Sequence, residues 1–143
     1  MSEYLSSFNY IFKVVIEHFD FKVKSIDDNT IFLIGDGYQL EFTMWRETVE
    51  VRFCVVKSNA ELLIYNVGNF IATYMTNEDR VIDDIIIPKG KPTVYIRNVK
   101  SLNYFLNALR HHFPSMLAGQ MNWLESYEKS EWYSQPRIEK RKV

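Results

Sequence analysis

The first stretch of the chain carries apolar side chains at intervals of three and four residues. Between residues 4 and 19 they form one helical face, which predicts an amphipathic helix. Ser2 is placed to cap its N-terminus, and Glu3 falls in the first turn, where the helix dipole favours a negative charge. The face consists of Leu5, Phe8, Phe12, Val15, Ile16 and Phe19.

From Phe21 the apolar spacing changes to two, which predicts β-strands. Four strands are expected within residues 21–24, 30–34, 38–43 and 49–56. The turns between them are Asp27-Asp28-Asn29, Gly35-Asp36-Gly37 and Trp45-Arg46-Glu47. Glycine supplies the positive φ that a tight hairpin needs, and aspartate and asparagine favour turns through their own side-chain hydrogen bonds. The pattern therefore predicts an antiparallel meander whose apolar face packs on the first helix.

In the second half of the chain, the periodic spacing of apolar residues is less regular. Residues 62–65 read as a short strand, 67–75 as a helical stripe and 93–97 as one more strand. Asn98 is placed to cap a second long helix, and Pro114 stops it, kinks it or opens a third helix. The second helix would bury Leu102, Phe105, Leu106, Leu109 and Phe113, and the third Leu117, Met121 and Leu124.

The order of elements predicts an α+β domain: an N-terminal helix, an antiparallel meander of about four to five strands, and C-terminal helices packed on the sheet. The chain has 143 residues, 47 % of them hydrophobic, which fits a single domain with a sizeable core. We expect this domain over residues 1–135 and a frayed basic tail over 136–143.

Charge is unevenly distributed, although the net charge is only −1. The tail holds four basic residues and one acidic residue, or +3, so that residues 1–135 carry −4 (13 basic, 17 acidic). Such a balance gives no uniform field to hold nucleic acid or an anionic membrane. An acidic body suits a cationic partner, although a charge run of this kind is most often a solvated surface.

Neither a disulfide nor a membrane segment is expected. Cys54 is the one cysteine, so no intramolecular disulfide can form. Lys13, Glu17 and His18 interrupt the apolar run near the N-terminus before it could span a bilayer. These features favour a cytoplasmic protein.

Residues with catalytic or metal-binding chemistry are few. His111 and His112 are adjacent, about 100° apart on a helix, so they cannot chelate one ion as an i, i+4 pair can. Near a helix C-terminus we expect them to meet terminal carbonyls. Cys54 lies in the middle of a strand and is expected to be a buried structural thiol. We expect no catalytic residue, no metal and no cofactor.

Acidic and aromatic residues supply the candidates for partner binding. Asp83 and Asp84 lie in a loop with Glu78 and Asp79, where consecutive carboxylates are normally solvated. Near the C-terminus, aromatic rings alternate with carboxylates, a composition found in protein interfaces. The alternative, given equal weight, is that the rings pack across the sheet. The predicted partner-binding residues are Asp83, Asp84, Trp123, Glu125, Tyr127, Glu128, Glu131 and Trp132.

In its layout the chain resembles small bacterial immunity proteins of polymorphic-toxin and contact-dependent growth inhibition systems. The stretches that carry the resemblance are Phe19-Asp20-Phe21, residues 48–53 (Thr-Val-Glu-Val-Arg-Phe) and residues 113–119 (Phe-Pro-Ser-Met-Leu-Ala-Gly). The resemblance implies a cytoplasmic protein that binds and neutralises a cognate toxin domain without catalysis. Many such toxins are basic nucleases, which suits an acidic body. No functional residue is carried over from the family.

Two functions are therefore open. The first is a protein-binding inhibitor of a cationic toxin. The second is a small enzyme or ligand-binding domain with a pocket between sheet and helices. A homodimer joined along a strand edge is compatible with either. Residues that could line the pocket are Tyr38, Trp45, Arg52, Cys54 and His112.

Overall fold

The structure is a computed structural model that describes residues 3–58, 60–83 and 86–140. It begins with helix α1 (Leu5–Phe19), as the apolar spacing predicts. The helix ends at Asp20, whose N–H donates to the Ile16 carbonyl. The left-handed φ of 55° at Asp20 turns the chain so that the Phe21 N–H donates to the same carbonyl at 3.0 Å. The N-cap position is Tyr4, without a side-chain hydrogen bond; Ser2, the expected cap, lies outside the described residues.

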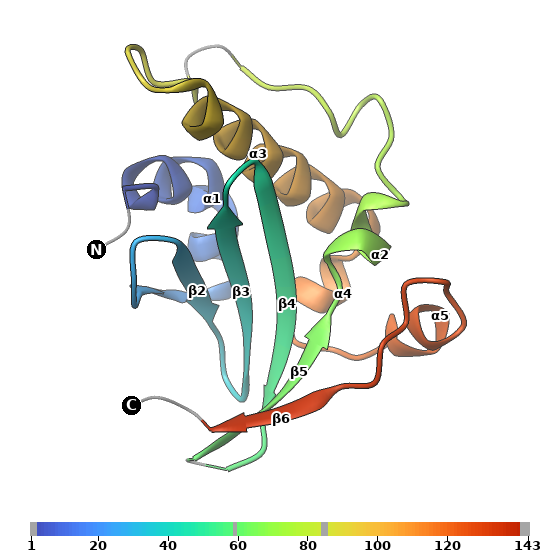
Figure 1. Cartoon of the computed structure of the whole chain (residues 1–143). Helices are drawn as coiled ribbons and strands as arrows, with labels where there is room; N and C mark the ends of the chain where they lie inside the picture. Colours follow the sequence, from blue (N-terminus) through green and yellow to red (C-terminus); the bar gives the residue numbers. More distant parts are fainter. Residues whose placement is uncertain (1–2, 59, 84–85, 141–143) are drawn as a thin grey trace.

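A six-stranded antiparallel sheet follows, in which each strand pairs with the next one in the chain (Figure 1). The meander is therefore confirmed, with slightly more strands than predicted. Its strands are β1 (Lys22–Ser25), β2 (Thr30–Ile34), β3 (Tyr38–Trp45), β4 (Thr48–Val56), β5 (Glu61–Asn66) and β6 (Arg137–Lys140).

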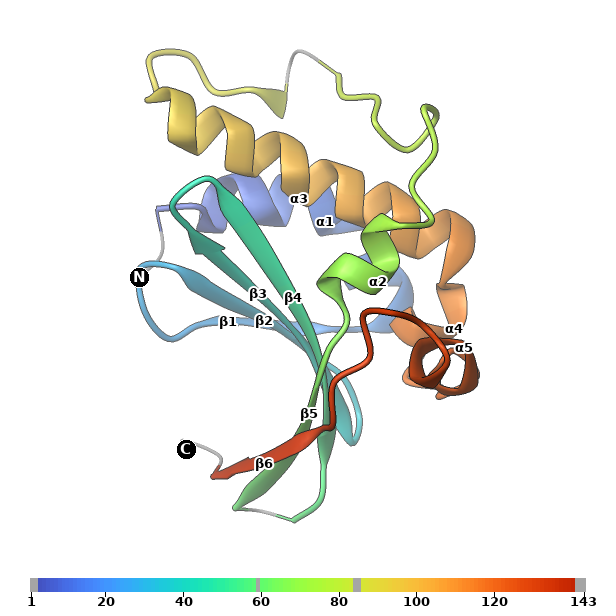
Figure 2. The same ribbon diagram turned by 45° about the vertical axis from the view of Figure 1, so that its right-hand side comes forward.

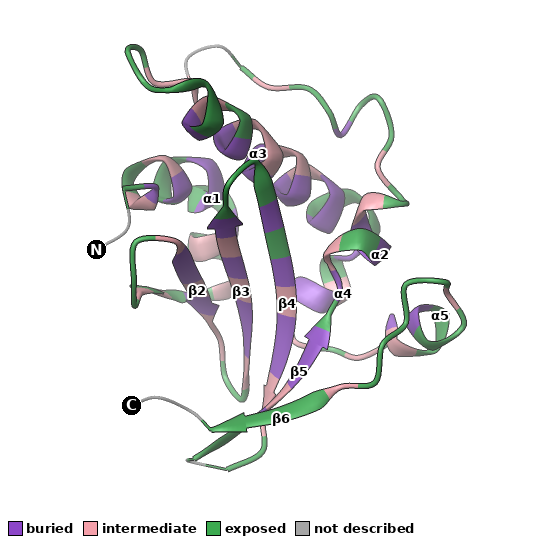
Figure 3. Ribbon diagram, viewed as in Figure 1, coloured by how far each residue is buried: buried purple, intermediate pink, exposed green. Residues whose placement is uncertain are grey.

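The sixth strand corrects the expectation of a frayed tail. Residues 137–140 pair with β5, in a register that sets Ile138 opposite Leu63. All four side chains of β6 are exposed (Figure 3), so the backbone ladder holds the strand in place rather than burial. For that reason the strand could not be predicted from an alternation of apolar and polar residues. Arg141, Lys142 and Val143 lie outside the described residues.

The turns follow the predicted chemistry. The Asp27 carboxylate accepts the backbone N–H groups of Asn29 and Thr30 at 2.8 and 2.7 Å, which closes the turn from β1 to β2. Gly37 has a φ of 80° in the turn from β2 to β3, a value that favours glycine. Arg46 adopts a φ of 55° between β3 and β4.

One segment was predicted wrongly: Thr93–Arg97 is not a strand but the start of the longest helix. The remaining helices are α2 (Gly68–Ala72), α3 (Thr93–His112), α4 (Pro114–Leu117) and α5 (Leu124–Glu128). Asn98, expected as a cap, is buried inside α3, where its amide donates to Tyr4 Oη at 3.0 Å and to the Arg46 carbonyl at 2.7 Å. These tertiary contacts outweigh the local preference of asparagine for a helix terminus.

The expected third helix is divided in two. Pro114 occupies the first turn of α4, where its missing N–H costs nothing. Gly119 then adopts a φ of 80° and ends the segment before α5 begins. The Tyr38 ring lies directly against Gly119, and its hydroxyl donates to the Leu117 carbonyl at 2.6 Å. This contact ties the segment after α4 to the sheet.

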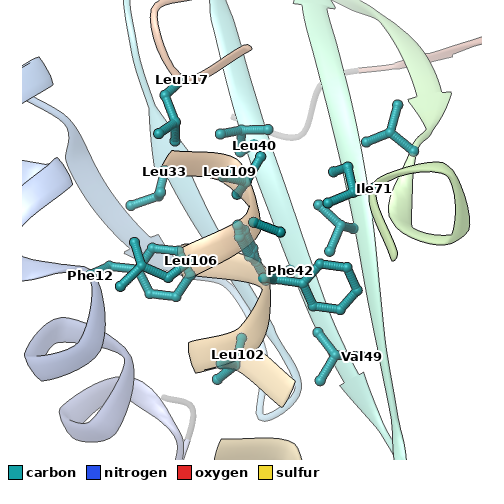
Figure 4. Packing of buried hydrophobic residues seen from close by; sticks show 14 of the residues in the cluster. Phe12, Leu33, Leu40, Phe42, Val49, Ile71, Leu102, Leu106, Leu109 and Leu117 are labelled. Carbon is teal, nitrogen blue, oxygen red and sulfur yellow. The ribbon is translucent and has the colours of Figure 1, made fainter. Parts of the chain in front are cut away.

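The helices pack on one face of the sheet and leave the other face uncovered (Figures 1 and 2). Strand register aligns Leu33, Leu40 and Phe53 across β2, β3 and β4 on the covered face. Leu102, Leu106 and Leu109 of α3 extend toward this row, together with Phe12 of α1 (Figure 4). Within the described residues, no helix combines the length and apolar character needed to cross a bilayer.

Candidate functional site

Two of the predicted partner-binding residues lie in the core. Trp123 is 4 % exposed and Tyr127 is fully buried, and their rings contact Tyr65 of β5 edge to face. The Trp123 indole N–H donates to the Gln120 carbonyl, and Tyr127 Oη donates to the Ser134 carbonyl. These rings pack across the sheet, so the expected surface patch does not include them.

The remaining members of the patch are exposed. Glu125 pairs with Lys129 one helical turn later, at 2.8 Å, and Glu128 and Glu131 are also exposed. Trp132 is 40 % exposed and lines a groove on the sheet described below. Asp83 is exposed in the loop before α3, and Asp84 lies outside the described residues. The predicted residues therefore do not form one contiguous site.

A polar cluster that the sequence did not predict lies at the C-terminus of α3. Asp79, expected on a solvated loop, is fully buried. Its carboxylate accepts hydrogen bonds from His111 Nδ1 at 2.6 Å and His112 Nε2 at 2.8 Å, and from the Thr76 backbone N–H at 2.8 Å. The expectation that the two histidines meet terminal carbonyls is therefore wrong: both meet one carboxylate.

The electrostatics of this cluster favour an ionised aspartate. Burial raises the pKa of Asp79, but the hydrogen bonds from Thr76, His111 and His112 outweigh burial and hold that pKa well below its usual value. Asn107 also donates to the Asp79 carbonyl at 2.9 Å. The cluster thus fastens an irregular loop to α3. Among the described residues, no three His, Cys, Asp or Glu side chains are grouped to hold a metal ion.

The uncovered face of the sheet, hereafter the open face, is the second candidate. Register places Phe32, Glu41 and Arg52 side by side across β2, β3 and β4 on this face. The neighbouring row is Lys22, Ile34, Gln39, Cys54, Ile64 and Arg137. An apolar centre with charged residues around it has the composition of a protein interface.

The described part of the chain has two hollows outside the core, one on the open face and one beside β4. The first, of about 190 Å³, is hereafter the Gln39 hollow. It is lined by Lys24, Ile26, Phe32, Ile34, Gln39, Glu41, Leu62, Ile64, Glu139 and Lys140. Because residues of both edge strands, β1 and β6, line it, the sheet is strongly curled.

Burial controls the acid–base chemistry around the Gln39 hollow. Burial raises the pKa of Glu41, an effect that the nearby Arg52 opposes. Burial, with the Glu41 carboxylate, raises the pKa of Cys54 to about 12. A fully buried thiol with this pKa is not a nucleophile near neutral pH, in agreement with the structural role expected for Cys54.

The second hollow, hereafter the β4 groove, has a volume of about 380 Å³. It runs along the first half of β4. Arg52 lines it, and the Arg52 strand neighbour Glu41 lines the Gln39 hollow. The lining residues are Thr48, Val49, Glu50, Val51, Arg52, Asn66, Gly68, Asn69, Trp132 and Ser134.

Arg52 is held loosely. Its terminal nitrogens lie 3.6 Å from Glu41 Oε1 and 3.8 Å from Glu50 Oε2, which is within ion-pair range but beyond hydrogen-bond range. Its Nε is buried without a hydrogen-bond partner among the described residues. Arginine has five N–H donors, so this side chain retains donor capacity at the groove.

The residues named for a pocket between sheet and helices are dispersed. Tyr38 packs against Gly119, Trp45 is exposed at the end of β3, and His112 donates a hydrogen bond to Asp79. Arg52 and Cys54 share the open face. Core side chains fill most of the interface between sheet and helices. The Gln39 hollow lies on the open face, and the β4 groove lies beside β4, where the first residues of α2 border it.

Fold and site together define an α+β protein with an antiparallel sheet covered on one face only. Comparisons of this chain with protein-family models, with curated proteins and with solved structures find no match.

Proposed function

We propose that this chain is a non-catalytic protein-binding module and that its open face contacts the partner. The observation that carries the proposal is the sheet face that no helix covers. Its partly exposed apolar side chains, Phe32 and Ile34, lie beside a small buried cluster of Cys54, Leu62 and Ile64, and charged residues border them. A partly exposed apolar surface with a charged border is typical of interaction surfaces.

The open face is smaller than one side of a standard interface. Its six strands hold 36 residues, which at about 3.3 Å per residue and about 4.8 Å between strands cover roughly 570 Å². Each partner buries roughly 800 Å² in a standard interface, so we expect the partner to contact residues beside the strands as well.

We further propose that the partner is a cationic toxin domain in the cytoplasm and that binding neutralises it. The layout-level resemblance to immunity proteins supports this choice. So does the charge of −4 on residues 1–135. Glu50, Glu128 and Glu131 are exposed, and Glu50 lines the β4 groove. Complementary charge accelerates association and weakens as salt rises.

The experiment combines capture with a functional assay. The tagged chain is isolated from its own cells at low salt, and native mass spectrometry identifies a stoichiometric partner. That partner is then produced in cells with and without the chain. The proposal expects growth arrest without the chain and growth with it. A partner whose production is harmless in both cases would contradict the inhibitor function.

A small-molecule-binding domain remains the second candidate, and the Gln39 hollow is the observation that favours it. Gln39 is 4 % exposed and lines this hollow beside Glu41. The volume of about 190 Å³ is below the roughly 300–1,000 Å³ of typical ligand pockets, which is why we rank this function second. A metabolite mass retained on the isolated chain in native mass spectrometry would reverse the ranking.

A further inference from the structure

The β4 groove lies where the sheet loses a strand. β4 extends from Thr48 to Val56, but its register with β5 covers only Arg52 to Val56. After Asn66 the chain leaves the sheet: Val67 donates to the Val51 carbonyl at 3.1 Å, and α2 begins at Gly68. The first half of β4 therefore has β3 on one side and the groove on the other.

The backbone of β4 is oriented toward this groove. In a strand, the N–H and C=O of one residue point to the same side, and successive residues alternate. Val56 N–H donates to Gly37 on the β3 side, whereas the Val51 carbonyl accepts from Val67 on the β5 side. Alternation then directs both backbone groups of Val49 into the groove, beyond the last residue paired with β5.

The side walls leave room for an extended chain. A Cβ on Gly68 would lie 3.1 Å from the Val51 backbone nitrogen, so glycine permits the chain to turn away close to β4. Trp132 and Ser134, which follow α5, also line the groove, together with Asn66 and Asn69. A strand of three residues is about 10 Å long, which matches the length of Thr48–Glu50.

The charged groups indicate what the incoming segment carries. The Arg52 guanidinium is beyond hydrogen-bond range of Glu41 and Glu50, so its outer N–H groups can donate to a backbone carbonyl. The Glu50 carboxylate is half exposed beside Trp132 along the groove. A carboxylate and an indole ring together favour a lysine or arginine side chain.

The outer edges of the sheet are protected against strand addition, in contrast to the groove. β1 reads Lys-Val-Lys-Ser and β6 reads Arg-Ile-Glu-Lys, and charged residues on edge strands oppose pairing with another chain.

We infer that the β4 groove binds an extended segment of a partner protein, which adds as a strand beside Thr48–Glu50 and seats a basic side chain between Glu50 and Trp132. This inference rests on the proposed protein-binding function and names the chemistry of the bound segment. Backbone hydrogen bonds to Val49 supply affinity, and the basic side chain supplies selectivity.

The test uses the whole chain and a displayed library of random linear 12-residue peptides. We expect selected peptides to be enriched in lysine and arginine. In ¹⁵N-labelled protein, a selected peptide should shift the Val49 amide and slow its hydrogen exchange at least about tenfold, while the Val23 amide of β1 stays unchanged. Trp132→Ala should weaken binding about tenfold. Tyr10→Ala, which removes an exposed aromatic ring from α1, is the matched control and should have no effect.

Each contrary result has a distinct meaning. Peptides that bind without protecting Val49, or a library that yields no binder, overturn strand addition. A chain that dimerises and protects Val49 without peptide assigns the groove to a second copy and also overturns the inference. None of these results decides the proposed function, because capture of a toxic partner tests that separately. Val49→Pro removes the N–H that faces the groove but also changes a side chain buried in the core, so its thermal unfolding is compared with that of Val49→Ile to confirm folding. A folded Val49→Pro variant that binds a selected peptide as tightly as the unmodified chain would contradict the inference.

Discussion

At the scale of single residues, the Asp79 cluster connects an irregular loop to the C-terminus of α3. Asp79 is fully buried, although the same loop contains the acidic residues Glu78 and Asp83. His111 and His112 of α3 reach its carboxylate from more than 30 residues away in the sequence.

The Asp79 cluster makes stability depend on acidic pH. A carboxyl whose pKa is lower in the folded state contributes stability above its unfolded pKa of about 4 and loses it as pH falls further. Asp79→Asn should therefore lower the free energy of unfolding by about 1–3 kcal/mol at pH 5. The difference from the unmodified chain should shrink between pH 4 and pH 2. Urea unfolding at several pH values measures it, and a difference that grows on acidification would contradict the assignment.

Cys54 should be unreactive while the chain is folded. Its pKa of about 12 leaves roughly one thiolate in ten thousand molecules at pH 8, and the side chain is fully buried. We expect a disulfide reagent to label the chain completely in 6 M guanidinium chloride and to label less than about a tenth of it in buffer over the same time. Rapid labelling of the native chain would show that the open face admits reagents to this thiol.

At the scale of elements, local patterns predicted α1 and the hairpins well and failed where tertiary partners decide. Thr-Val-Tyr-Ile at residues 93–96 has the β-branched and aromatic residues of a strand. It forms the first turn of α3 because Tyr95 is buried against Tyr4, their rings stacked 4.5 Å apart. Similarly, β6 could not be predicted from its own residues, because it is held in place by backbone pairing with β5.

Gly119 lies between α4 and α5, and we expect its substitution to lower the stability of the chain strongly. Its φ of 80° disfavours any side chain, and an added Cβ would lie 2.5 Å from the Tyr38 ring. Gly119→Ala should lower the free energy of unfolding by about 2–4 kcal/mol. Gly90 is a matched control, because it has a φ of 78° with no atom within 4 Å of its Cβ position. Gly90→Ala should cost about 1 kcal/mol. Thermal unfolding measures both variants. An equal loss of free energy of unfolding in the two would show that the close contact of Gly119 with Tyr38 adds nothing to the cost of the substitution.

At the scale of the whole molecule, the sequence predicted the α+β architecture but left open which aromatic residues belong to the core. Trp123 packs against Phe53 and Tyr65 of the sheet and is 4 % exposed, whereas Trp132 is 40 % exposed. Trp123→Ala should therefore lower the free energy of unfolding by about 3–5 kcal/mol. Trp132→Ala should change it by less than about 1 kcal/mol. Equal effects in guanidinium unfolding would contradict this placement.

The open face could not be predicted from local patterns, because it depends on which face of the sheet the helices cover. Along β3 and β4 the alternation of apolar and polar residues predicts two different faces. It does not predict the curl that forms the Gln39 hollow or the early departure of β5 that leaves the β4 groove. Both hollows depend on segments distant in sequence.

The most direct measurement is the affinity of the captured partner for two variants of the chain, by titration calorimetry. Ile34→Glu places a charge at the apolar centre of the open face, and Val14→Glu places the same charge at an exposed position of α1. We predict that Ile34→Glu weakens binding at least about a hundredfold and that Val14→Glu leaves it unchanged. Both variants must first show unfolding transitions like that of the unmodified chain. Unchanged affinity for Ile34→Glu, or a loss confined to Val14→Glu, would contradict the assignment of the open face as the interface.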